Sequence, residues 1–70
     1  MESAGGTQTG TVVRLEPALG FGYVSNGAGN RYIFVVGLAI SNREAARLRV
    51  GSHVRFDLVG QGRVERLALN

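Results

Sequence analysis

The 70-residue sequence contains no cysteine, no tryptophan and no lysine, and it has one proline and one histidine. Without cysteine the chain cannot form a disulfide scaffold, a thiolate zinc site or a redox pair. A single histidine cannot by itself build an imidazole metal site. No hydrophobic run approaches the roughly 20 residues that a membrane-spanning helix needs, and residues 1–9 lack the layout of a signal peptide. We therefore expect a cytoplasmic protein without metal or cofactor, stabilised by its hydrophobic core.

Eight arginines against five acidic residues give the chain a formal charge of +3. A positive balance favours a polyanionic partner such as a nucleic acid, but this charge is modest, and a GC-rich genome also produces many arginines. Seventy residues make one domain, which buries only about 60% of the surface of its unfolded chain. A second domain or a large substrate cavity is therefore not expected. The positions of the arginines in the fold decide what the charge means.

Short apolar runs alternate with glycine-rich breaks, which is typical of an all-β domain with short strands. Residues 1–8 are small and polar, and they are predicted to form a flexible tail ahead of a domain at residues 9–70. Five strands are predicted, at residues 10–16, 20–25, 32–36, 53–59 and 63–69. Because open edges would invite aggregation, five short strands favour a sheet that closes on itself. The sequence therefore predicts a small five-stranded antiparallel barrel.

Between the third and fourth strands the sequence predicts a short helical segment. Ser41 and Glu44 have the spacing of a capping box and are followed by helix-compatible residues, so one or two turns are expected within residues 38–50. The glycines at both ends of residues 60–62 predict a tight hairpin between the last two strands.

The last two strands carry the clearest alternation. Val54, Phe56 and Leu58 lie on one side of the fourth strand and are predicted to be core residues. In the fifth strand the pair at residues 65–66 interrupts the alternation of the apolar residues around it. A β-bulge would bring those apolar residues back into phase.

Aromatic residues predict a binding surface on the second and third strands. Alternate residues of a strand share one face. If the core residues of these strands are Val24, Ile33 and Val35, the opposite faces form one exposed aromatic patch, made of Phe21, Tyr23 and Phe34. Flat rings beside arginines suit a single-stranded nucleic acid, whose bases stack on the rings. The glycines between the rings would let a base lie flat. The alternative is that the rings only pack across strands.

The motifs that contain these rings resemble those of the cold-shock domain family. Residues 20–24, Gly-Phe-Gly-Tyr-Val, are similar to its first RNA-binding motif, and residues 33–36, Ile-Phe-Val-Val, are similar to its second. The similarity extends over residues 9–69. The resemblance implies an OB-type barrel that binds single-stranded RNA or DNA, as an RNA chaperone or as a regulator of transcription or translation. It places the three rings at the stacking positions of the family.

The sequence also departs from the pattern of that family. Arg14 stands where the family has a tryptophan, Leu19 where it has a lysine, and Val36 and Gly37 where the second motif ends in histidine and phenylalanine. A guanidinium plane also stacks on bases, so Arg14 is either a replacement for the ring or a solvated strand residue. The face is more apolar and less basic than in the family. A rival interpretation is therefore a surface that binds protein or another copy of the chain.

The predicted nucleic-acid site combines three rings with three arginines, two of them as candidates for phosphate contacts. Its residues are Arg14, Phe21, Tyr23, Arg31, Phe34 and Arg55. His53 stands alone and the carboxylates are dispersed, so no catalytic or metal-ligating pattern is present. We therefore predict a protein that is not an enzyme and has no small-molecule substrate or membrane partner. We expect a monomer rather than a homodimer.

Overall fold

The computed structural model describes residues 7–60 and 62–70, and over this part of the chain it is all-β with one turn of helix. The elements are β1 (Gln8–Glu16), β2 (Phe21–Asn26), β3 (Arg31–Val35), α1 (Asn42–Ala45), β4 (His53–Val59) and β5 (Arg63–Leu69). The five predicted strands are confirmed, with ends within two residues of the prediction, and the short helix lies within the predicted residues 38–50. Gln8 was assigned to the tail but belongs to β1, where it pairs with Phe56. Residues 1–6 of the predicted tail, and Gln61 of the predicted hairpin, lie outside the described residues.

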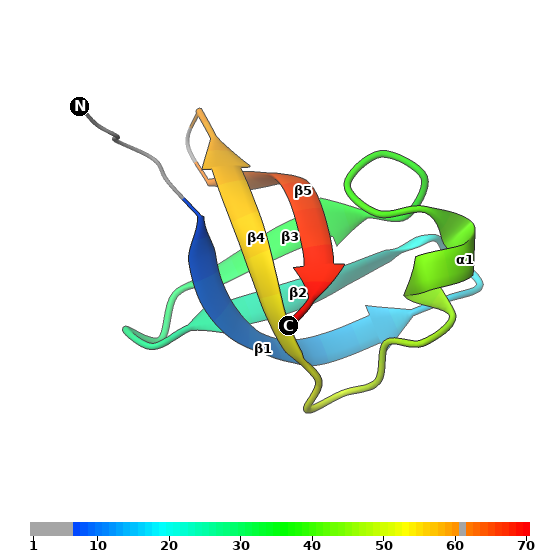
Figure 1. Cartoon of the computed structure of the whole chain (residues 1–70), viewed down its shortest axis with the longest axis horizontal. Helices are drawn as coiled ribbons and strands as arrows, with labels where there is room; N and C mark the ends of the chain where they lie inside the picture. The colour runs from blue at the N-terminus through cyan, green and yellow to red at the C-terminus, as the bar shows by residue number, and fades with distance from the viewer. Residues whose placement is uncertain (1–6, 61) are drawn as a thin grey trace.

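The strands form one antiparallel sheet in the order β3-β2-β1-β4-β5. The first part of β1 pairs with β4, and the strand from Gly10 onward pairs with β2. Figure 1 shows that β1 is strongly curved, so that β4 and β5 lie in front of β2 and β3. β3 and β5 approach each other, but the described strand pairs include no β3–β5 ladder. The sheet is therefore strongly bent rather than closed by hydrogen bonds.

The local signals of the sequence are confirmed. The backbone amide of Glu44 donates a hydrogen bond to the Ser41 hydroxyl oxygen at 3.2 Å, which caps α1. On β5, Val64 and Arg66 pair with consecutive residues of β4, so Glu65 is the extra residue of a β-bulge. The bulge turns both Val64 and Leu67 into the core.

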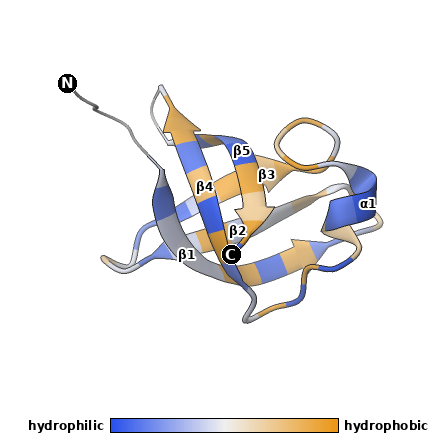
Figure 2. Cartoon of the chain, in the orientation of Figure 1, coloured by the Kyte–Doolittle hydropathy of each residue, from blue (hydrophilic) through white to orange (hydrophobic). Residues whose placement is uncertain are grey.

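The core lies between the two halves of the bent sheet. Figure 2 shows the alternation of hydrophobic and hydrophilic residues along β4. Of the three residues predicted there as core, Val54 and Phe56 are buried, and Leu58 is partly buried against them. The buried apolar residues come from all five strands and from the segment between β3 and β4: Val12, Val24, Phe34, Ala39, Ile40, Leu48, Val54, Phe56, Val64 and Leu67.

The assignment of the two faces of β3 was wrong. Phe34 is fully buried, whereas Ile33 and Val35 each expose 37% of their surface. The cause lies on β2, where Gly22 pairs with Phe34. A Cβ atom at Gly22 would lie 2.6 Å from Cζ of Phe34. The ring therefore occupies the space that the missing side chain leaves in the core, and Gly22 does not serve to make room for a base on the outside.

Gly22→Ala is expected to destabilise the domain. Its added methyl group would lie 2.6 Å from the Phe34 ring and 2.6 Å from the backbone oxygen of Arg14, which cannot move without distorting β1. Overpacking of this kind costs about 1–3 kcal/mol, measurable as a lower free energy of unfolding in urea. Gly27→Ala is the control, because a Cβ atom there meets nothing within 4 Å. Equal stability of the two variants would contradict this packing.

Candidate nucleic-acid interface

The side of β1, β2 and β3 that points away from the core forms one surface, which we call the outer face. Cross-strand pairing defines it, because Tyr23 pairs with Arg14 on β1 and with Ile33 on β3, and Phe21 pairs with Val35. The outer face includes Val13, Arg14, Glu16, Phe21, Tyr23, Arg31, Ile33 and Val35. It contains both predicted rings of β2 and two of the three predicted arginines.

Phe21 and Tyr23 are half-buried neighbours on this face. Their ring centroids are 5.8 Å apart and their planes stand at 89°, an edge-to-face arrangement that aromatic pairs favour. Bases stacked on both rings would therefore lie almost perpendicular to each other unless one ring rotates. The two rings offer separate stacking positions rather than one continuous platform.

The third predicted ring is not part of the outer face. Phe34 has no exposed surface, so it cannot stack on a base in this conformation. Ile33 and Val35 stand there instead, opposite Tyr23 and Phe21. Opposite the two rings the surface of β3 is therefore aliphatic, and it can cover a base but offers no aromatic stacking.

A hollow on the outer face brings the predicted cations to one of the rings. It has a volume of about 330 Å³ and is lined by Val13, Arg14, Tyr23 and Arg31. The register of β1 jumps between Val12 and Arg14, which makes Val13 a bulge residue and sets Arg14 opposite Tyr23. Arg31 comes from the other neighbour of β2. The ring of Tyr23 therefore stands between two strands that each supply an arginine.

Glu16 also belongs to the outer face, although the sequence did not predict it as a residue of the site. Its Oε2 accepts a hydrogen bond from Nε of Arg14 at 2.9 Å. The side chains are 58% exposed for Arg14 and 34% exposed for Glu16, and an ion pair at a surface contributes about 0–1 kcal/mol. The sequence did hold a signal for this contact, since residues two apart on a strand share a face. Glu16 reduces the positive charge that Arg14 and Arg31 give the outer face.

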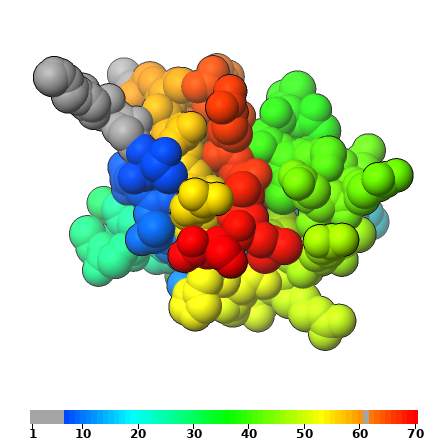
Figure 3. All heavy atoms as spheres, in the orientation of Figure 1, coloured from blue at the N-terminus to red at the C-terminus, as the bar shows by residue number. Residues whose placement is uncertain are grey.

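Arg55 is exposed as predicted but lies away from the outer face. It pairs with Thr9 on β1 and with Ala68 on β5, in the half of the sheet that does not contain β2. Figure 3 shows the side of the molecule on which β4 and β5 lie in front. There Arg55 borders a different hollow, together with Asp57 and Arg66. The structure therefore does not bring Arg55 together with Arg14 and Arg31.

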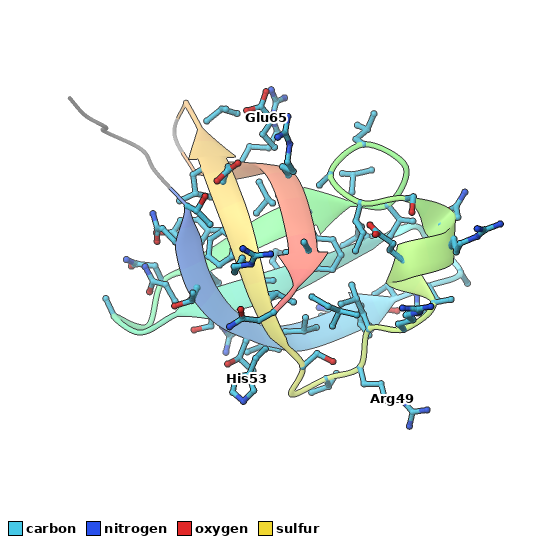
Figure 4. All side chains as sticks on the ribbon, in the orientation of Figure 1. Arg49, His53 and Glu65 are labelled. Carbon is cyan, nitrogen blue, oxygen red and sulfur yellow. The ribbon has the colours of Figure 1, made fainter. Side chains whose placement is uncertain are left out.

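Three further charged or titratable residues of the described part of the chain do not converge. In Figure 4, Arg49, His53 and Glu65 extend from different parts of the chain and point away from one another. Among the described residues, no group of three or more histidine, aspartate or glutamate side chains is placed to hold a metal ion. No helix in the described part of the chain is long and apolar enough to cross a membrane.

Comparison with protein-family models, with curated proteins and with solved structures finds no match to this chain. The resemblance of residues 20–24 and 33–36 to the cold-shock motifs therefore remains a prediction from the sequence.

Proposed function

We propose that this domain binds single-stranded RNA or DNA on its outer face. Bases stack on Phe21 and Tyr23, and Arg14 and Arg31 contact phosphates. The observation that carries the proposal is the hollow that Tyr23 lines together with these two arginines, which come from the two strands beside β2. A ring with two cations in the same hollow suits a base and the phosphates that flank it. By analogy with the family that the motifs resemble, the protein would act as an RNA chaperone or as a regulator of transcription or translation.

We also propose that the bent sheet is an OB-type barrel in which β3 and β5 lie close together without a ladder of hydrogen bonds between them. Two observations on the segments at this gap support the proposal. A Cβ atom at Gly62, next to β5, would lie 3.2 Å from the ring of Tyr32 on β3. The amide of Leu67 on β5 donates a hydrogen bond to the carbonyl of Ala39, just after β3, at 2.8 Å. The strand order, with β3 and β5 at the two approaching edges, is the order that such a barrel requires.

Salt dependence tests the proposed function. Base stacking on an aromatic ring contributes about 1–3 kcal/mol for each base, so two rings support weak binding with little sequence preference. Fluorescein-labelled hexathymidylate is titrated with the full chain at several salt concentrations. Contacts of Arg14 and Arg31 with two phosphates predict a slope of about −1.4 for log K against log salt, because each phosphate of a single strand contributes about −0.7. Absence of binding at low salt, or binding that salt does not change, would contradict the proposal.

Glu16→Gln is expected to strengthen binding. The substitution removes a carboxylate that repels phosphates and that occupies Nε of Arg14 at 2.9 Å. Because an exposed ion pair contributes up to about 1 kcal/mol, the dissociation constant of hexathymidylate should fall by about 2- to 5-fold. Glu65→Gln makes the same charge change at the bulge of β5, on the other half of the sheet. If both variants bind equally tightly, net charge rather than the outer face controls affinity.

A second candidate function is association with protein, including another copy of the chain. The observation that favours it is the aliphatic surface of Ile33 and Val35, each 37% exposed, where a third ring was predicted. Sedimentation equilibrium over a wide concentration range tests self-association. A mass that rises with concentration, and that falls back in Ile33→Ser, would favour this function over binding of nucleic acid.

A further inference from the structure

A second hollow adjoins the outer face at Phe21. Of the residues predicted to bind nucleic acid, only Phe21 lines it. It has a volume of about 320 Å³. Its walls come from the end of β1, the start of β2, the residue just after β3, and residues 42–48, which contain α1. They include Leu15, Phe21, Val36, Asn42, Ala46 and Leu48. Most of these side chains are apolar. The hollow is therefore a concave, mainly apolar site that shares Phe21 with the outer face.

Two small residues at the end of α1 line this hollow. They are Ala45, the last residue of α1, and Ala46, its C-cap, and neither side chain extends beyond Cβ to fill the space. Leu48 is buried and forms part of the apolar wall. Asn42, an exposed residue at the start of α1, brings an amide group to the lining. An amide both donates and accepts hydrogen bonds.

The charge of the chain segment that supplies one wall of the hollow indicates what kind of ligand fits it. The segment from Asn42 to Arg49 carries three arginines, at positions 43, 47 and 49, and one acidic residue, Glu44, which leaves a net charge of +2. Figure 4 shows Arg49 extending from this part of the chain into solvent. None of these arginines is among the lining residues, but they belong to the same chain segment as Asn42, Ala46 and Leu48. Apolar walls with one asparagine, next to a positively charged segment, suit a flat ring with a polar edge that is joined to phosphates.

We propose that this hollow binds a nucleobase of the same strand that crosses the outer face. The proposal rests on the proposed function and deepens it. The base packs between Phe21 and the alanines of α1, and its polar edge hydrogen-bonds to the Asn42 amide. Arginines of the same segment contact the adjoining phosphate. The hollow thereby supplies a third base position, which the buried Phe34 does not provide on β3.

Filling the hollow tests this inference. Ala46→Leu adds side-chain volume at an exposed lining position, and Asn42→Ala removes the amide at another exposed position. Ala68→Leu is the matched control, since Ala68 lies on β5 and does not line the hollow. Each variant is titrated with fluorescein-labelled hexathymidylate and hexaadenylate, and circular dichroism verifies its fold. Because one stacked base contributes about 1–3 kcal/mol, Ala46→Leu should weaken hexathymidylate binding by about 5- to 100-fold, while Ala68→Leu binds like the wild type. Asn42→Ala should reduce the difference in affinity between the two oligonucleotides.

The outcomes separate this inference from the proposed function. If the wild type binds neither oligonucleotide at low salt, both fail. If the wild type binds and Phe21→Ala weakens binding, but Ala46→Leu and Asn42→Ala bind as the wild type does, the hollow holds no base and the outer face alone is the site. If Ala46→Leu alters self-association in sedimentation and leaves oligonucleotide affinity unchanged, the hollow receives protein and the inference is overturned. Should Ala46→Leu fail to fold, Asn42→Ala at an exposed position still tests the inference, because an unchanged difference in affinity between the two oligonucleotides would overturn it.

Discussion

Phe34→Ala is expected to unfold much of the domain rather than to weaken binding selectively. The ring has no exposed surface and packs against Gly22 across the β2–β3 pair. Truncation of a buried phenylalanine to alanine costs about 3–5 kcal/mol, which is a large part of the roughly 5–15 kcal/mol that stabilises a natural domain. Urea unfolding followed by circular dichroism measures the loss.

Phe21→Ala is the matched comparison for this effect. Phe21 is half-buried on the outer face, so its truncation should cost clearly less stability than truncation of Phe34. If the two rings were both exposed, as the sequence predicted, the two variants would be equally stable. Equal unfolding midpoints would therefore contradict the inward orientation of Phe34.

The double variant Phe21→Ala/Tyr23→Ala is expected to lose binding of single strands while keeping its fold. Removal of two stacking rings at about 1–3 kcal/mol each weakens binding by about 2–6 kcal/mol, which corresponds to at least about a 30-fold rise in the dissociation constant. The titration with labelled hexathymidylate at low salt measures it.

Conservative variants serve as the control for this result. Phe21→Tyr and Tyr23→Phe keep a ring at each position, so they should bind within a few-fold of the wild type. An affinity of the double variant that stays within about twofold of the wild type would show that the rings do not carry the interaction. The nucleic-acid proposal would then have to be abandoned in favour of protein association.

Much of the fold follows from local signals in the sequence. The alternation in β4, the bulge that restores the phase of β5 and the Ser41 cap each depend on residues that lie close together in the chain. Such signals predict a strand and its inward face correctly where only one alternation of residues buries the apolar side chains. The boundaries of β4 and β5 were accordingly predicted without error.

The orientation of β3 could not be settled in the same way, because both of its faces are apolar. One face carries Tyr32 and Phe34, the other Ile33 and Val35, and period-two patterning alone does not choose between them. The choice depends on Gly22, which lies on the neighbouring strand and leaves room in the core for one large ring. The inward orientation of Phe34 therefore depends on the register between β2 and β3, which the sequence of β3 alone does not contain.

The positions of the predicted arginines relative to one another could not be predicted from single strands either. The sequence identifies Arg14, Arg31 and Arg55 as candidate contacts for a nucleic acid, and all three are exposed. Whether they meet depends on the strand order and on the bulge at Val13, which sets Arg14 beside Tyr23. Arg55 follows β4 into the other half of the sheet.

Chemical-shift mapping with a short single strand tests the central claim most directly. The nitrogen-15-labelled full chain is titrated with unlabelled hexathymidylate, and the amide signals are followed. Binding on the outer face predicts that the signals of Arg14, Tyr23 and Arg31 shift together and saturate, while that of Arg55 stays in place. Absence of shifts at millimolar oligonucleotide, or shifts confined to β4 and β5 around Arg55, would contradict the account.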